Sequence, residues 1–244
     1  MQAFRENNSE HDVVLEYLEA GGTGEEILLL LGNENRSIED ISVIFNVLQC
    51  IFIRIVTDLS SYLPDAEETS KCLLQSHTTT FHRLLGGSSY SAKKAALKLL
   101  TVMSTLSAKV AKYILTYLKL NFNLTFKLAK EENQNSTRRH FIHFVLSFLI
   151  EGSSSVIKLM LDKTGLLKSI FPGLVYDSAE TIELVLMTIK KYVLENPAIS
   201  KTTKLHVFNS TTLRILFELF NWRGRHKPVK KKFWKNSSEG ATNE

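Results

Sequence analysis

Residues 177–197, DSAETIELVLMTIKKYVLENP, carry a helical pattern that is apolar on more than one side. Asp177 or Ser178 can cap its start by accepting backbone N–H groups of the first turn. Pro197 cannot continue a helix and ends the pattern. Because the apolar residues cover more than one stripe, a helix here needs packed neighbours on several sides. The chain is therefore expected to build its core by packing helices against one another.

Similar helical patterns recur along the chain. The capping sequence SIED, residues 37–40, predicts the start of a long helix that Pro64 is expected to end. Polar residues 131–136 are expected to form a loop, and Pro172–Gly173 a break between helices. No run alternates polar and apolar residues between turn signals, so strands are not expected. Helices are predicted at 12–20, 25–31, 38–62, 66–76, 78–85, 91–106, 108–119, 123–130, 137–150, 153–162, 164–171, 178–195, 201–207 and 210–221.

The spacing of the longest helices predicts the architecture. They begin near residues 38, 91, 137 and 178, in steps close to the ~40–47 residues of HEAT and armadillo units. We therefore predict an all-α fold, an armadillo- or HEAT-like helical repeat solenoid over residues 1–221. A compact bundle of about eight or more helices fits the same pattern and stays open as the alternative.

Charge is distributed unevenly along the chain. Residues 1–70 hold 3 Lys/Arg and 14 Asp/Glu, a net charge of −11, whereas residues 71–140 hold 12 against 2, or +10. Residues 141–221 hold 8 against 7, or +1, and residues 222–244 hold 7 against 2, or +5, which accounts for the overall +5. An acidic start with a basic middle and end indicates a polyanion or a charged protein surface as partner.

The basic residues of the middle region are candidates for contacts with RNA phosphates, because acidic residues are nearly absent among them. The alternative is an ordinary solvated helix face. Arg138 and Arg139 lie at an expected helix start, where the helix dipole disfavours positive charge. This placement indicates a functional role, such as binding an anion. The candidates are Lys93, Lys94, Lys98, Lys109, Lys112, Lys119, Arg138 and Arg139.

Residues 222–244 form a basic tail that we expect to be disordered in the free protein. Its segment RGRHKPVKKKFWK holds seven Lys/Arg residues, with Phe233 and Trp234 set among them. Such a segment can neutralise phosphates while its aromatic rings stack on unpaired bases. The run KPVKKK also fits a nuclear-import signal. The tail candidates for RNA contact are Arg223, Arg225, Lys230, Lys231, Lys232 and Lys235.

No arrangement of residues in the sequence indicates an enzyme. Residues 21–24, GGTG, lack the strand and the lysine of a phosphate-binding loop and are interpreted as a helix connector. His140 and His143 lie one helical turn apart, but no nearby cysteine or carboxylate completes a metal site. We therefore expect no catalytic residue, no metal, no cofactor and no small-molecule substrate. The most apolar stretches, 43–56 and 141–150, are too short or too interrupted to span a bilayer, so no membrane partner is expected.

One long stretch of the chain resembles a known family. Residues 138–220 carry, in order, a phenylalanine-rich helix, a turn of the form lfpGL..D at 171–177, a helix ending in VLENPAISK, and K..vFN...L at 204–213. This order resembles the N-terminal region of the nucleolar pre-ribosomal-associated protein 1 family. The preceding segments AALKLLTVM (95–103) and NFNLTFKLA (121–129) also fit that family.

The resemblance implies an armadillo-like helical protein of the nucleus and nucleolus. It implies a role without catalysis in early assembly of the large ribosomal subunit, in contact with pre-ribosomal RNA, small nucleolar RNA and other assembly factors. Members of that family are much longer, and a fragment is one interpretation of this chain. Together with the charge pattern, the resemblance predicts a scaffold that binds RNA through a basic solenoid surface. The alternative is an armadillo-type adaptor that binds a peptide or a helix without RNA contact.

Overall fold

The computed structural model describes residues 13–22, 24–32, 36–118 and 132–221. Across these ranges the regular structure is helical and contains no strand. The chain divides into two compact units, Met1–Tyr113 and Ile114–Glu244, and each is considered by itself. The prediction of an all-α fold is confirmed for the described part of the chain. The helix expected at 123–130 lies outside it.

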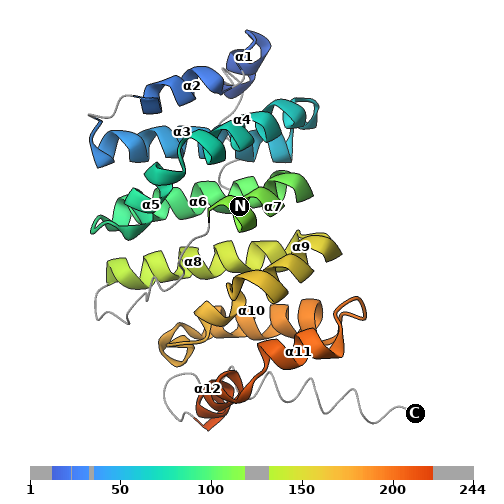
Figure 1. The fold of residues 1–244 in the computed structure, drawn as a ribbon. Helices are drawn as coiled ribbons and strands as arrows, with labels where there is room; N and C mark the ends of the chain where they lie inside the picture. The colour runs from blue at the N-terminus through green and yellow to red at the C-terminus, as the bar shows by residue number, and fades with distance from the viewer. Residues whose placement is uncertain (1–12, 23, 33–35, 119–131, 222–244) are drawn as a thin grey trace. The chain divides into compact units, whose positions relative to one another are not determined.

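Unit 1 contains six helices in its described part, and a seventh crosses its boundary with unit 2. They are α1 (Val13–Glu19), α2 (Glu25–Leu29), α3 (Ile38–Thr57), α4 (Leu63–Ser76), α5 (Thr78–Gly86), α6 (Tyr90–Leu106) and the boundary helix α7 (Ala108–Tyr117). Short 3-10 turns follow α2 at Leu30–Gly32 and α3 at Ser60–Tyr62. The two long helices, α3 and α6, lie side by side, and α4 and α5 pack on α6 (Figure 1).

The core of unit 1 lies between α3 and α6, because both helices present small or apolar residues at helical spacing. Phe45 and Phe52 of α3 are fully buried. Ala92 and Ala96 of α6 are buried too, and their small side chains allow the two helices to approach closely. The ring of Phe81 from α5 packs against Phe45 with 4.9 Å between the ring centres. This aromatic contact joins α5 to the α3–α6 pair.

By length and composition alone, α3 is long and apolar enough to cross a membrane. The expectation that this stretch is too short or too interrupted therefore does not hold for the helix as a whole. The core helix of a soluble protein passes the same test. We interpret α3 as a core helix, because its buried side packs on α6. No other helix in the described ranges meets the criterion.

The junction between α3 and α4 differs from the prediction that Pro64 ends the first helix. α3 ends earlier, at Thr57, and the Asp58 carboxylate there accepts a hydrogen bond from Thr57 Oγ1 at 2.7 Å and another from Arg54. Pro64 lies in the first turn of α4. Proline is tolerated there because first-turn N–H groups have no acceptor inside the helix. Pro64 therefore marks the start of a helix rather than the end of one.

Ser37 caps α3, as the SIED pattern predicts, and its Oγ accepts the N–H of Asp40 at 3.0 Å. We expect Ser37→Ala to lower the free energy of unfolding by about 1 kcal/mol, because a first-turn donor loses its acceptor. Urea-induced unfolding followed by circular dichroism measures the change. Ser153→Ala is the matched control, since Ser153 holds the same position before α9 (Ser154–Leu159) without a side-chain cap bond. Equal losses in both variants would contradict the capping explanation.

Unit 2 is built around a pair of helices, α8 and α10, that lie side by side (Figure 1). Its helices are α8 (Glu132–Ile150), α9 (Ser154–Leu159), α10 (Ala179–Ile189), α11 (Lys201–Val207) and α12 (Ser210–Asn221). One π-helical segment extends α9 over Met160–Thr164, and another extends α10 over Lys190–Leu194. Two 3-10 turns, Leu167–Ile170 and Leu174–Tyr176, connect the first segment to α10.

Phenylalanines of α8 dominate the core of unit 2. Phe144 and Phe148 are fully buried and pack edge to face, with 5.2 Å between their ring centres. Val185 of α10 is also fully buried. Met187 and Leu194, which lie outside the main apolar stripe of that helix, are exposed. Neighbours in the described residues therefore cover only part of its apolar circumference.

The loop predicted at 131–136 is wrong from Glu132 onward, because α8 begins there. The segment EENQNS contains no glycine or proline, and Glu and Gln are good helix formers. The helix therefore continues toward the N-terminus beyond its apolar part. Arg138 and Arg139 consequently lie in the second turn of α8 rather than at its start. The helix dipole disfavours positive charge only in the first turn, so it no longer supports an anion-binding role for these two arginines.

Candidate nucleic-acid interface

Three of the candidate lysines lie on α6. Lys94 and Lys98 are one turn apart and partly exposed, and Thr101 continues their line along the helix surface. Lys93 is offset from that line, and its ammonium lies 5.7 Å from the centre of the Tyr90 ring. The aliphatic stems of such half-buried lysines cover apolar surface while their ammonium groups reach water. This side of α6 therefore presents a line of positive charge.

Two further candidates, Lys109 and Lys112, lie one turn apart on the exposed side of α7. Val110 and Ala111, on the other side of this helix, are buried. The packing of the apolar residues therefore leaves both lysines at the surface, as the spacing of the sequence predicts.

Acidic and basic residues of unit 1 are segregated along the chain. From Thr78 to the end of unit 1, every charged residue is a lysine or an arginine. The acidic residues that the structure describes in this unit all lie between Glu16 and Glu68, on α1–α4 and their connections. Lys71, which follows these acidic residues on α4, forms a salt bridge with Glu68, with 2.9 Å between Nζ and Oε1. The helices α5–α7 therefore carry positive charge without acidic residues among them, a distribution suited to contact with phosphates.

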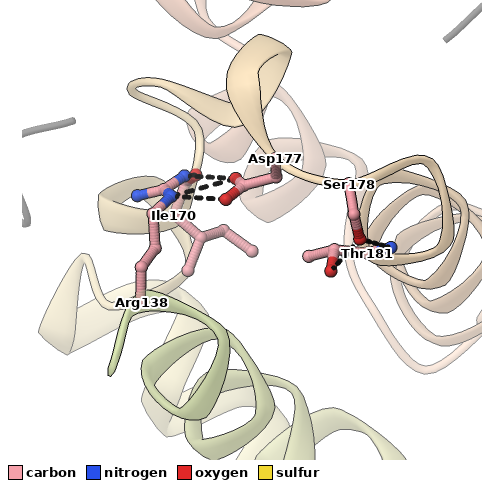
Figure 2. A network of polar contacts seen from close by, with 5 residues as sticks. All are labelled: Arg138, Ile170, Asp177, Ser178 and Thr181. Atoms are coloured by element: carbon pink, nitrogen blue, oxygen red, sulfur yellow. Dashed lines mark hydrogen bonds and ion pairs between the residues drawn. The ribbon is translucent and has the colours of Figure 1, made fainter. Parts of the chain in front are cut away.

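Arg138 differs from these lysines because its guanidinium is buried. Figure 2 shows its contacts with Asp177. Its side chain is 5% exposed and that of Asp177 is 10% exposed. Nε donates to both carboxylate oxygens of Asp177 at 2.9 Å, and Nη2 lies 2.8 Å from Oδ2. Nη2 also donates to the backbone carbonyl of Ile170 at 2.9 Å. A guanidinium enclosed in this way is not accessible to a phosphate, so this placement argues against an RNA contact by Arg138.

Asp177 and Ser178 are both possible helix caps in the sequence, but only Ser178 caps a helix in the structure. Ser178 caps α10, because its Oγ accepts the N–H of Thr181 at 3.3 Å. Asp177 instead holds Arg138, and so links the start of α10 to α8 (Figure 2). The cap and the ion pair together fix where α10 begins.

The predicted break at Pro172–Gly173 precedes this cap and forms a tight turn. The N–H of Leu174 donates to the carbonyl of Phe171 at 3.0 Å across the turn. Gly173 has a φ of 81°, a region that suits glycine because it has no Cβ. The turn lies four residues before Asp177, whose carboxylate pairs with Arg138 of α8.

Arg139 is exposed on α8, unlike its neighbour Arg138. Burial, together with the positive charge of Arg139, lowers the pKa of His143, so this imidazole is neutral near pH 7 and adds no positive charge. Within the described residues, no group of three His, Cys, Asp or Glu side chains is placed so that it could hold a metal ion, and this includes the surroundings of His140 and His143. Of the two candidates that the structure describes in unit 2, Arg138 and Arg139, the exposed one is Arg139.

Several candidates lie outside the described residues, and their role stays a prediction. These are Lys119 and the tail residues Arg223, Arg225, Lys230, Lys231, Lys232 and Lys235.

Two side-chain contacts in unit 2 are not predicted from the sequence. The first is the ion pair of Arg138 with Asp177, and the second places Lys168 Nζ 3.0 Å from His206 Nε2 on the surface of unit 2. Their partners are 39 and 38 residues apart in the chain. No local pattern in a single sequence connects positions at such separations.

Paired helices with lysines on their outer sides define the class of the protein, an all-helical protein with a basic surface segment. The chain belongs to the family Npa1, described as ribosome 60S biogenesis N-terminal, whose model matches residues 26–242. The resemblance predicted from residues 138–220 is thereby confirmed. The family match is wider than that stretch and includes most of the acidic N-terminal region and of the tail.

Two curated relatives are similar over most of the chain. Nucleolar pre-ribosomal-associated protein 1 of Homo sapiens is 30% identical over 218 residues, which are 88% of this chain and 10% of the human protein. The protein of the same name from Mus musculus is 31% identical over 217 residues, 87% of this chain and 10% of the mouse protein. The chain thus spans about a tenth of the length of these relatives. No solved structure matches it.

Proposed function

We propose that the chain acts as part of a non-enzymatic scaffold in assembly of the large (60S) ribosomal subunit, in the nucleolus. Membership of a family described by 60S biogenesis supports the process. The words nucleolar and pre-ribosomal in the names of the human and mouse relatives support the place. The proposed partners are pre-ribosomal RNA, small nucleolar RNA and other assembly factors.

We propose that the helices of residues 1–221 form an armadillo- or HEAT-like solenoid, followed by a basic tail at 222–244. The helices α3, α6, α8 and α10 begin at residues 38, 90, 132 and 179, in steps of 52, 42 and 47 residues, in or near the length of such repeat units. Within each unit two of them lie side by side. A compact bundle is the competing architecture, and it would lack the extended surface that a scaffold uses.

We propose that this scaffold contacts RNA phosphates through the lysines of α6 and α7. The observation that carries the proposal is the segregation of charge in unit 1, where helices α5–α7 hold basic residues and no acidic ones. Lysines bind phosphates as point charges and release counterions, so this contact reads the charge and shape of RNA and not its bases. The proposed contacts are Lys93, Lys94, Lys98, Lys109, Lys112 and Arg139, with Lys119 and the six basic tail candidates added from the sequence.

Replacement of Lys93, Lys94, Lys98, Lys109 and Lys112 by glutamate tests the interface. We expect affinity for a pre-ribosomal RNA fragment to fall by at least about tenfold, because a protein with fewer lysines at the interface releases fewer counterions on binding. The slope of log affinity against log salt should become shallower by about 0.7–0.9 for each phosphate that is no longer neutralised. Fluorescence anisotropy with labelled RNA at several salt concentrations measures both quantities.

The matched control reverses five lysines of unit 2, namely Lys158, Lys168, Lys190, Lys191 and Lys201, which changes the net charge by the same amount. It should reduce affinity much less. An equal loss in both variants would show a general effect of net charge and would remove the proposed interface. RNA crosslinking in cells, followed by sequencing of the attached RNA, then identifies the partner.

A protein-only adaptor remains the second candidate, because α3 exposes apolar side chains opposite its buried face. Val43, Val47 and Ile53 are all exposed on this helix. An exposed apolar stripe can accept a partner helix or peptide. An adaptor of this kind predicts no salt-dependent RNA binding, so the same titration separates the two functions.

A further inference from the structure

A tyrosine begins the line of lysines on α6. Tyr90 lies one turn before Lys94, which lies one turn before Lys98, so the three side chains follow one another along the same side of the helix. All three are partly exposed. Each step of four residues advances about 6 Å along the helix axis. An aromatic ring and two ammonium groups therefore share one strip of surface, which we call the α6 strip.

The position of Lys93 shows that one face of the Tyr90 ring lies at the surface. The Lys93 ammonium lies over this ring, 5.7 Å from its centre. The ammonium group of a partly exposed lysine stays in water, so the face of the ring beneath it borders the solvent and is covered by a flexible side chain. At an exposed site a cation–π contact is weaker than the stacking of a nucleic-acid base on an aromatic ring. A base can therefore displace the ammonium from the ring.

We infer that the α6 strip binds single-stranded RNA, with a base stacked on Tyr90 in place of the Lys93 ammonium. The displaced ammonium, together with Lys94 and Lys98, then contacts phosphates of the same strand. Bases in a duplex stack on one another and are not available to a protein ring, whereas unpaired bases are. This mode of binding depends on the proposed contact with RNA and narrows it to unpaired strands. It adds no preference for sequence, because every base has an aromatic face.

A second tyrosine–lysine contact, in unit 2, has different surroundings. The ammonium of Lys191 lies 4.9 Å from the ring centre of Tyr192, which is also half-buried. Three residues later in the chain, Glu195 Oε1 lies 3.5 Å from Lys190 Nζ. A carboxylate repels a phosphate, whereas helices α5–α7 contain no acidic residue. Of the two tyrosines, Tyr90 is the one that combines a lysine over its ring with a basic surface.

Replacing Tyr90 with leucine tests the stacking, since leucine keeps an apolar side chain on α6 but has no ring. The probes are a single-stranded oligoadenylate, an abasic strand with the same number of phosphates, and an RNA duplex. We expect Tyr90→Leu to weaken binding of the oligoadenylate by about tenfold, because one stacked base is lost. Binding of the other two probes should not change. The slope of log affinity against log salt should also stay the same, because tyrosine carries no charge and releases no counterion.

Two variants serve as controls in the same fluorescence anisotropy titrations. Tyr90→Phe keeps the ring and should bind every probe like the unsubstituted protein. Tyr192→Leu, the matched control, should do the same, because it removes a tyrosine with a lysine over its ring outside the basic helices. Circular dichroism should show equal helix content in all variants.

The abasic strand decides whether the ring stacks on a base or only supports the lysines. Equal losses for the oligoadenylate and the abasic strand in Tyr90→Leu would overturn the inference, as would unchanged binding of the oligoadenylate. Equal losses in Tyr90→Leu and Tyr192→Leu would overturn it too. So would equal affinities of the unsubstituted protein for the oligoadenylate and the abasic strand, a result that does not depend on any variant.

Failure of the proposed RNA contact gives a different result. The variant with the lysines of α6 and α7 reversed would then bind all three probes as tightly as the unsubstituted protein, and the α6 strip would have no role in RNA binding. If that variant loses affinity for all three probes while Tyr90→Leu binds them normally, the phosphate contacts stand and the stacking on Tyr90 is refuted.

Discussion

Replacing Asp177 with alanine is expected to lower the free energy of unfolding by about 3–5 kcal/mol, because it leaves the guanidinium of Arg138 buried without its counter-ion. Three contacts of 2.8–2.9 Å join the two side chains, and both are nearly inaccessible to water. After the change, the carbonyl of Ile170 would still accept from Nη2 but would not neutralise the charge. Urea-induced unfolding followed by circular dichroism measures the loss.

A surface pair supplies the control for this prediction. Arg214 and Glu218 of α12 are 3.8 Å apart, with side chains 74% and 64% exposed. Glu218→Ala should change stability by no more than about 1 kcal/mol, because water screens exposed pairs. The double change Arg138→Met with Asp177→Leu should cost less than Asp177→Ala alone, because it removes both charges. A loss in Asp177→Ala as small as that in Glu218→Ala would show that the buried pair contributes little.

Local signals in the sequence predict most of the helices. Ser37 and Ser178 cap helices as their sequence context predicts, since a cap depends on an acceptor and an N–H three residues apart. The turn at Pro172–Gly173 follows from the conformations these two residues prefer. The exposure of the lysines on α6 and α7 follows from the spacing of the apolar residues between them. Each of these features is decided within a few residues of chain.

The features that the sequence does not predict depend on ambiguous signals or on distant residues. Pro64 fits both the end of one helix and the first turn of the next, and only the packed structure distinguishes them. The polar residues before Arg138 fit a loop as well as an exposed helical turn. Arg138 and Arg139 are equivalent in the sequence, yet Arg138 is buried against the carboxylate of Asp177, 39 residues away, whereas Arg139 is exposed. Charge alone therefore selects too many residues for the candidate interface.

The Phe45–Phe81 contact gives the second large expected effect, in the core of unit 1. Phe45 of α3 is fully buried and packs on Phe81 of α5, so Phe45→Ala is expected to cost about 3–5 kcal/mol through reduced burial and the cavity left behind. Val43→Ala, two residues away on the exposed side of α3, should change stability by no more than about 0.5 kcal/mol. Urea-induced unfolding of both variants measures the difference. Since the two positions share one helix, a similar loss in both would mean that α3 is stabilised along its whole circumference, contrary to a core helix with one outward face.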